Sequence, residues 1–401
     1  MSEADNHADK RRAAPAGPLD GIRVLDLTAV VLGPLATQVL ADFGADVIKV
    51  EGPEGDLMRA NGVSQHAGMS SIYLALNRNK RSVVLDLKSA EGAAALRGLI
   101  AGADVLVHNM RVAAIERLGF GYAEVTRINP RIVYCMATGF GQDGPHADKP
   151  AFDDIIQAGC GLVALGSAAG ERPEYVPSLL ADKTTGLALA NAVLAALLYR
   201  ERHGVGQMVE VPMLETMTAF VMTEHLGGLT FEPPPAGAGY ARLLQGGRRP
   251  APTRDGWICA LPYTERHWQA FFRAVGRDDL AERYDVADRA QRNANIRALY
   301  GHLAELTPAR STGEWMQLFE SLDIPATPIY GLDALVDHPH LRAVGLFQQT
   351  RHPTEGPLRE LRPAARFSAT PLSLRRHAPA LGEHTNEVLR ELGIAQDARQ
   401  S

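Results

Sequence analysis

Short apolar runs alternate with helix-spaced segments along the first part of the chain. Residues 22–27 and 46–51 are β-rich, and residues 35–43 between them have helical spacing that ends at Gly44. A strand, a helix and a strand with short connections predict a βαβ unit, with parallel strands and a right-handed crossover. The pattern recurs as a strand, a helix and two strands at residues 82–87, 91–101, 103–107 and 131–136. The sequence therefore predicts an α/β fold with a Rossmann-like, doubly wound sheet.

Ligands of such sheets bind at the carboxyl ends of the strands, so loops 28–34, 51–59 and 108–118 are the expected binding loops. The first of them lacks the three glycines of a dinucleotide-binding turn, which argues against NAD or FAD. The chain also has no P-loop motif and no GxSxG nucleophile elbow.

The second half of the chain changes character. A helical segment at 184–202 precedes the Pro/Gly-rich stretch 231–239. The middle of the chain then predicts a strand at 257–261 and helices at 267–275, 292–306 and 312–322. The tail predicts a β-like run at 367–371 and a helix at 386–392. We expect a disordered N-terminus at 1–17, a large α/β domain formed by 18–225 and a C-terminal return at 335–401, and a smaller α+β domain with linkers at 226–334.

Composition narrows the function classes. A net charge of −5 gives no footprint for nucleic acid. The three cysteines are widely separated, which predicts no disulfide framework and no metal site. The longest apolar stretch, residues 187–198, is too short to span a bilayer. We expect a soluble, cytoplasmic protein.

Asp182 is the candidate nucleophile, in the segment LLADKTTG. Taken alone, an aspartate before a helix more often caps that helix, although a carboxylate can also act as a covalent nucleophile. Seven basic residues near the sheet loops are either a solvated face or a site for an anionic cofactor: Arg59, Arg78, Lys80, Arg81, Lys88, Arg111 and Arg117. The pair Gly246-Gly247 is either a plain turn or a mobile lid.

Several long motifs resemble the class III coenzyme A transferases, the family of formyl-CoA transferase, carnitine CoA-transferase and α-methylacyl-CoA racemase. They occur in order over nearly the whole chain: GIRVLDLTAVVLGPLATQVLADFGADVIKVEGPEGDLMR, NRNKRSVVLDLK, ADVLVHN, RLGFGY, NPRIVYCMATGFGQDGP, LLADKTTG, ALLYRERHGVGQMVEVPMLE and APALGEHTNEVLRELG.

The resemblance implies a CoA-transferase in which Asp182 attacks an acyl-CoA thioester, giving an aspartyl anhydride and then an aspartyl-CoA thioester. CoA or acyl-CoA is a substrate, with no permanently bound cofactor. The positions that match the family's CoA site are Val30, Leu85, Lys88, Asn109, Arg117 and Gly139. The resemblance further implies a homodimer of interlocked chains.

Departures from the family pattern narrow the chemistry. Gly52, Val31, Thr138 and Phe140 replace the residues expected of a formyl-CoA transferase, which favours a larger or less polar acyl group. Phe152 stands where a racemase has histidine, and a phenyl ring cannot transfer a proton. The alternatives are an acyl-CoA racemase and a non-catalytic acyl-CoA-binding protein. A dicarboxylate such as succinate is a candidate donor or acceptor. Arg242, Arg248 and Arg249, near the glycine pair, either face solvent, which is the favoured interpretation, or meet its second carboxylate.

Overall fold

The computed structural model describes residues 16–168, 170 and 172–394. Within the chain, two compact units separate. Unit 1 comprises residues up to 162, 175–220 and 344 onward, and unit 2 comprises residues 163–174 and 221–343. We expected residues 1–17 to be disordered. Residues 1–15 of that segment lie outside the described residues.

Unit 1 is built on a six-stranded sheet in the order β3-β2-β1-β4-β5-β6, with every neighbouring pair parallel. This is the strand order of a doubly wound nucleotide-binding sheet, and it confirms the predicted α/β class. The strands are β1 (Arg23–Leu27), β2 (Asp46–Glu51), β3 (Lys80–Val84), β4 (Val105–His108), β5 (Val133–Thr138) and β6 (Gln207–Pro212).

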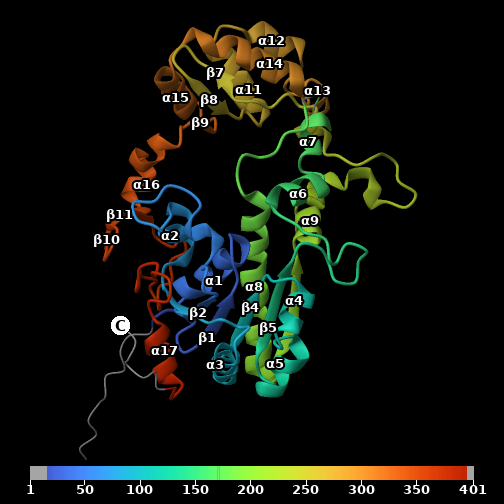
Figure 1. The fold of residues 1–401 in the computed structure, drawn as a ribbon. Helices are drawn as coiled ribbons and strands as arrows, with labels where there is room; N and C mark the ends of the chain where they lie inside the picture. Colours follow the sequence, from blue (N-terminus) through green and yellow to red (C-terminus); the bar gives the residue numbers. More distant parts are fainter. Residues whose placement is uncertain (1–15, 169, 171, 395–401) are drawn as a thin grey trace, which may run out of the picture. The chain divides into compact units, whose positions relative to one another are not determined.

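Helices cover both faces of this sheet. On one face α1 packs against α8, and α8 also contacts β5 and β6 (Figure 1). On the other face a continuous apolar core joins the sheet to α3, α4, α5 and α17. The helices of unit 1 are α1 (Leu32–Asp42), α2 (Ser71–Asn77), α3 (Ala90–Ala101), α4 (Val112–Arg117), α5 (Tyr122–Ile128), α6 (Asp153–Gly159), α8 (Leu180–His203) and α17 (Thr385–Glu391). An antiparallel hairpin of β10 (Phe347–His352) and β11 (Gly356–Leu361) belongs to the same unit.

Unit 2 has its own core, in which Trp268, Phe271, Trp315 and Phe319 are fully buried. Its small antiparallel sheet is formed by β7 (Ala251–Pro252), β8 (Trp257–Ala260) and β9 (Ala326–Pro328). Its helices include α7 (Ala164–Ala168), α10 (Ala241–Leu244), α11 (Glu265–Ala274), α12 (Asp278–Arg283), α13 (Arg289–Ala294), α14 (Ile296–Leu306), α15 (Thr312–Ser321) and α16 (Pro339–Ala343). Helix α9 (Met213–His225) crosses from unit 1 into unit 2.

Several expected element boundaries were wrong. The strand expected at 82–87 is β3, which begins at Lys80, a residue that only a buried ion pair makes acceptable in a core strand. Helix α1 begins before Pro34 rather than after it, because proline in a first helical turn lacks only an N–H that needs no partner there. The helix expected at 292–306 is interrupted at Asn295, which ends α13 and precedes α14.

Two other differences concern strands at the margins of unit 1. The pattern at residues 207–212 was not assigned as a strand, yet it forms β6 at the edge of the sheet, where half-exposed side chains weaken the hydrophobic signal. No strand forms at 367–371; the β structure of the C-terminal return is the hairpin before it.

Helices α1 and α8 approach each other at a glycine. A Cβ added at Gly186 would lie 2.6 Å from the carbonyl oxygen of Leu32 and 3.3 Å from a methyl group of Leu35. Only glycine therefore allows this approach, which brings the first turn of α8 next to the loop that follows β1.

Within the described residues, no helix is long and apolar enough to cross a membrane.

Gly186→Ala should destabilise unit 1 by about 1–3 kcal/mol, because the added methyl group meets rigid backbone and forces the two helices apart. The measurement is urea-induced unfolding of the purified protein. The matched control is Gly98→Ala in α3, where the new Cβ would lie 3.4 Å from a flexible leucine side chain. The free energy of unfolding of this control variant should be unchanged or higher by about 0.5–1 kcal/mol, because alanine favours a helix more than glycine does. Equal unfolding curves for both variants would contradict the close-packing argument.

Candidate active site

Asp182 lies in the first turn of α8 and does not cap it. The helix begins at Leu180, the residue before it is Leu179, and no side chain of α8 makes a capping hydrogen bond there. The interpretation of Asp182 as a helix cap was therefore wrong. Its side chain is buried, with 9% of the residue exposed.

The backbone N–H of Asp182 donates a hydrogen bond to a side chain on another helix, α6. It donates to Oδ1 of Asp153 at 2.8 Å, which satisfies one of the N–H groups that every helix start leaves without an intrahelical partner. The second oxygen of Asp153 accepts from the Gln157 side chain at 2.6 Å. Gln157 is fully buried and also bonds the backbone of Val176 and Ser178. Asp153 is thus held firmly, and the Asp182 carboxylate is not used for capping.

This environment changes the acidity of Asp182. Burial, and secondly the negative charge of Asp153, raise the pKa of Asp182 to about 7. A carboxylate with this pKa is more basic than an ordinary one and is still ionised in a large fraction of molecules at neutral pH. Such a shift in a cleft is typical of a functional group.

The Asp182 side chain lines a cleft of about 410 Å³ in unit 1. The cleft is bounded by the loops that follow β1, β4 and β5, at the carboxyl edge of the sheet where ligands were expected. Most of its lining residues are apolar, and the polar or charged ones are Asn109, Arg111, Thr138, Gln142, Lys149 and Asp182. The lining includes Leu27, Val30, Leu32, Leu57, Asn109, Arg111, Val112, Gly139, Lys149, Phe152 and Met213.

A second cavity of about 310 Å³ adjoins the cleft, because Leu27, Ala29 and Met110 line both. Leu85 and Lys88 lie in its wall. Lys88 is exposed, and its ammonium group has no ion pair among the described residues. The two adjoining cavities form one site, in which Lys88 lines the second cavity and Arg111, Lys149 and Asp182 line the cleft.

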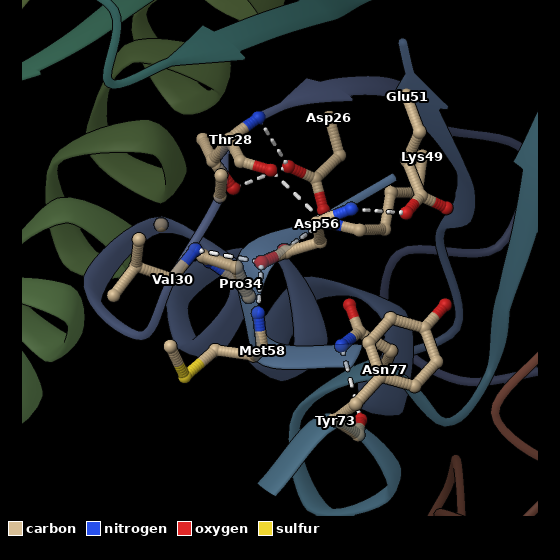
Figure 2. Close-up of polar contacts among 12 residues, drawn as sticks. Asp26, Thr28, Val30, Pro34, Lys49, Glu51, Asp56, Met58, Tyr73 and Asn77 are labelled. Carbon is tan, nitrogen blue, oxygen red and sulfur yellow. Dashed lines mark hydrogen bonds and ion pairs between the residues drawn. The ribbon is translucent and has the colours of Figure 1, made fainter. Parts of the chain in front are cut away.

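Val30, which lines the cleft, has a strained backbone conformation. Its φ of 73° lies in the left-handed region, which a β-branched residue rarely adopts. Asp56 holds the loop in place: its Oδ1 accepts from the backbone N–H of Val30 at 3.1 Å and of Met58 at 2.9 Å (Figure 2). Backbone strain of this kind persists only where surrounding bonds determine the conformation.

Asp56 belongs to a buried network of three ion pairs beneath the first two binding loops. Lys49 pairs with Asp56 at 2.8 Å, Lys80 with Asp26 at 3.0 Å and Arg59 with Glu51 at 2.7 Å. Burial alone would raise the pKa of Asp26, but the charges of Lys80 and Lys49 outweigh it and hold that pKa well below its ordinary value. Figure 2 shows four members of this network, Asp26, Lys49, Glu51 and Asp56, close to one another.

The remaining predicted positions differ in surroundings. Asn109 lines the cleft, but its amide bonds the backbone of Ala29 in both directions, accepting at 3.0 Å and donating at 2.8 Å. Gly139 allows a close approach, because a Cβ there would lie 2.3 Å from Cβ of Ala151. Arg117 is exposed on α4 and lines neither cavity, although its neighbour Leu118 lines the second.

The seven basic residues are not one cluster. Four of them are buried in ion pairs with carboxylates: Arg59, Arg78, Lys80 and Arg81. For these four, both interpretations, a solvated face and an anion site, were wrong. Lys88 and Arg111 line the cavities.

Sequence reasoning missed three residues of the site. Lys149 lines the cleft, and Asp153 with Gln157 supports the start of α8. The i, i+4 spacing of Asp153 and Gln157 was the available signal. Among the described residues, no group of three His, Cys, Asp or Glu side chains is placed to hold a metal ion.

Comparison with known proteins identifies the family of this chain. The family model "CoA-transferase family III" matches residues 19–385. The chain is 33% identical over 389 residues to a succinate–glutarate CoA-transferase of Agrobacterium fabrum, covering 94% of this chain and 96% of that protein. It is 32% identical over 382 residues to the probable fatty acyl-CoA transferase Rv3272 of Mycobacterium tuberculosis, covering 92% of this chain and 97% of that one.

Solved structures show the same fold. A CaiB/BaiF family protein from Brucella suis superposes with a TM-score of 0.81 at 29% identity, covering 94% of this chain and all of that chain. A structure of Rv3272 gives a TM-score of 0.80 at 31% identity, with 94% and 100% covered. The chain is an enzyme of the CoA-transferase type, and it belongs to CoA-transferase family III.

Proposed function

We propose that this enzyme moves CoA from an acyl-CoA thioester to a free carboxylic acid, with Asp182 as the covalent nucleophile. The observation that supports this most directly is the Asp182 carboxylate. It is buried, lines the cleft and has no hydrogen-bond or ion-pair partner of its own in the part of the chain that the structure describes. Its raised pKa makes it a stronger nucleophile than an exposed aspartate.

The chemistry is four exchanges without net proton transfer. The Asp182 carboxylate attacks the thioester carbonyl, a C–O bond replaces the C–S bond, and CoA leaves as thiolate. The thiolate then attacks the Asp182 carbonyl of the mixed anhydride and releases the first acid, which leaves an aspartyl-CoA thioester. The acceptor carboxylate attacks that thioester, and the thiolate finally attacks the acceptor's acyl carbonyl, which regenerates Asp182. The apolar cleft walls would keep water from both reactive intermediates.

The two adjoining cavities suit a CoA thioester. We place the nucleotide end near Leu85 and Lys88, where a lysine without an acidic partner can meet a phosphate. The thioester end then lies in the cleft with Val30, Gly139 and Asp182. Asn109 would hold the backbone of Ala29 in place beside the bound ligand. Arg117, exposed on α4, is a further proposed contact to CoA.

The acids, the assembly and the domain roles belong to the same proposal. Relatives are named for succinate and glutarate transfer, which supports a dicarboxylate as donor or acceptor. We propose that unit 1 is the CoA-binding domain, that unit 2 is the small domain, and that two chains form an interlocked homodimer.

Racemisation is not favoured. It requires an acid or base that exchanges the proton next to the thioester carbonyl, and the cleft presents the exposed ring of Phe152 at the position concerned.

Asp182→Asn and Asp182→Ala should lower CoA exchange by at least about 10³-fold, because no covalent intermediate can form. Exchange is measured by mass spectrometry across donor thioesters and acceptor acids. Intact mass should show a CoA adduct on the unsubstituted protein that hydroxylamine removes and that both variants lack. Circular dichroism checks that the variants fold. Turnover near the original rate in both would exclude Asp182 as the nucleophile, and solvent deuterium entering the acyl-CoA without any acceptor acid would indicate a racemase.

Asp153→Asn should shift the pH dependence of adduct formation at Asp182, so that the rate begins to fall only at a lower pH. The adduct forms only from ionised Asp182, so its rate should rise with pH and level off above about 7. Removing the charge of Asp153 lowers the pKa of Asp182, while an amide oxygen can still accept from its N–H. The readout is the single-turnover rate of adduct formation against pH. Asp154→Asn, an exposed neighbour on α6, is the matched control; if both variants share one profile, Asp153 does not tune the nucleophile.

A further inference from the structure

Unit 2 contains a cavity of about 730 Å³ that shares no lining residue with either cavity of unit 1. Three arginines line it, each from a different helix. Arg242 comes from α10, Arg289 from α13 and Arg297 from α14. Arg289 and Asn293 lie four residues apart on one side of α13, and Arg297 lines the same cavity from α14, beyond the break at Asn295.

These arginines lack counter-charges. None of the three makes an ion pair or a side-chain hydrogen bond with another described residue, and no described Asp or Glu lines the cavity. The Nε of Arg242 is buried without a partner. Three like charges around one cavity repel each other, and an anion bound among them removes that repulsion.

The part of the cavity wall around Arg242 is held in place by its neighbours. The guanidinium carbon of Arg242 lies 4.6 Å from the ring centroid of Tyr263, a stacked arrangement that orients it. A Cβ at Gly246 would lie 2.2 Å from the carbonyl oxygen of Arg242, and one at Gly247, with φ of 65°, would lie 3.1 Å from the Arg297 side chain. The glycine pair is therefore a packed turn that joins two of the arginine walls.

We propose that this cavity, the arginine pocket, binds a small aliphatic dicarboxylate. Guanidinium groups pair with carboxylates through two parallel hydrogen bonds, and arginines on separate helices can each hold one end of a dianion. Between them, Ala241, Ala294 and Ile296 offer apolar surface for the methylene groups. Binding here goes beyond the exchange chemistry of Asp182 and does not require that residue.

The test is isothermal titration of the full-length protein at low salt. Succinate is compared with butanoate, which has the same number of carbons and one carboxylate, and with 3′,5′-ADP as a source of phosphates. The variants are Arg289→Gln, Arg297→Gln and Asp182→Asn. Arg266→Gln, an exposed arginine of unit 2 outside the cavity, is the matched control.

Succinate should bind at least tenfold more tightly than butanoate. Arg289→Gln and Arg297→Gln should each weaken succinate binding at least tenfold, while Arg266→Gln leaves it unchanged. Loss of succinate binding in Asp182→Asn alone would place the anion at the nucleophile and overturn the proposal. Equal binding in all variants would overturn it too. If 3′,5′-ADP displaces succinate and is itself weakened by the two arginine variants, the pocket is a phosphate site and the dicarboxylate assignment is wrong. A failure of CoA exchange in Asp182→Asn bears only on the proposed function.

Discussion

Six buried charges beneath the first two binding loops hold the active-site edge of the sheet in one arrangement. Lys49, Lys80 and Arg59 balance Asp56, Asp26 and Glu51, so no charge in the network is left without a partner. Removing one member would leave a buried ion uncompensated, which costs more than the pair contributes when intact. Because Asp56 also bonds the backbone of Val30, the loops at 28–34 and 51–59 cannot move independently. The strained conformation of Val30 is a consequence of this constraint.

Capping the start of α8 and acting as the nucleophile are tasks that one aspartate could not perform together, and here two aspartates share them. A carboxylate that caps a helix is stabilised by the N–H groups it accepts from, which lowers its pKa and its nucleophilicity. Here Asp153 bonds the start of α8 from a different helix, and its charge adds to burial in raising the pKa of Asp182. The glycine at 186 completes the arrangement, because it lets α8 approach the loop after β1. The proposed nucleophile is therefore prepared by its neighbours.

The sequence predicted the sheet and the position of Asp182, but not the contacts that give Asp182 its properties. Apolar strands such as β1, β2 and β5 carry a strong local pattern, whereas the edge strand β6 and the hairpin β10–β11 are half-exposed and do not. Lys80 and Arg81 were expected on a solvated face or in an anion site, because their carboxylate partners lie far away in the chain, on β1, β2 and α17. The bond between Asp153 and Asp182 likewise joins residues 29 positions apart in two helices. Periodicity and motif spacing report local structure, and these pairings exist only in the folded chain.

The two units are constrained to different degrees, and this bears on how readily each of their sites can change. In unit 1 the cleft rests on buried ion pairs and a close helix contact, so most substitutions there would disturb folding as well as chemistry. In unit 2 the arginine pocket is formed by side chains on short surface helices, and Arg289 and Arg297 are exposed. Under our proposal, a change at these two positions alters the recognised anion while the CoA cavity and Asp182 keep their geometry. A substitution on α13 or α14 should therefore change which anion the pocket binds without disturbing the fold of unit 1.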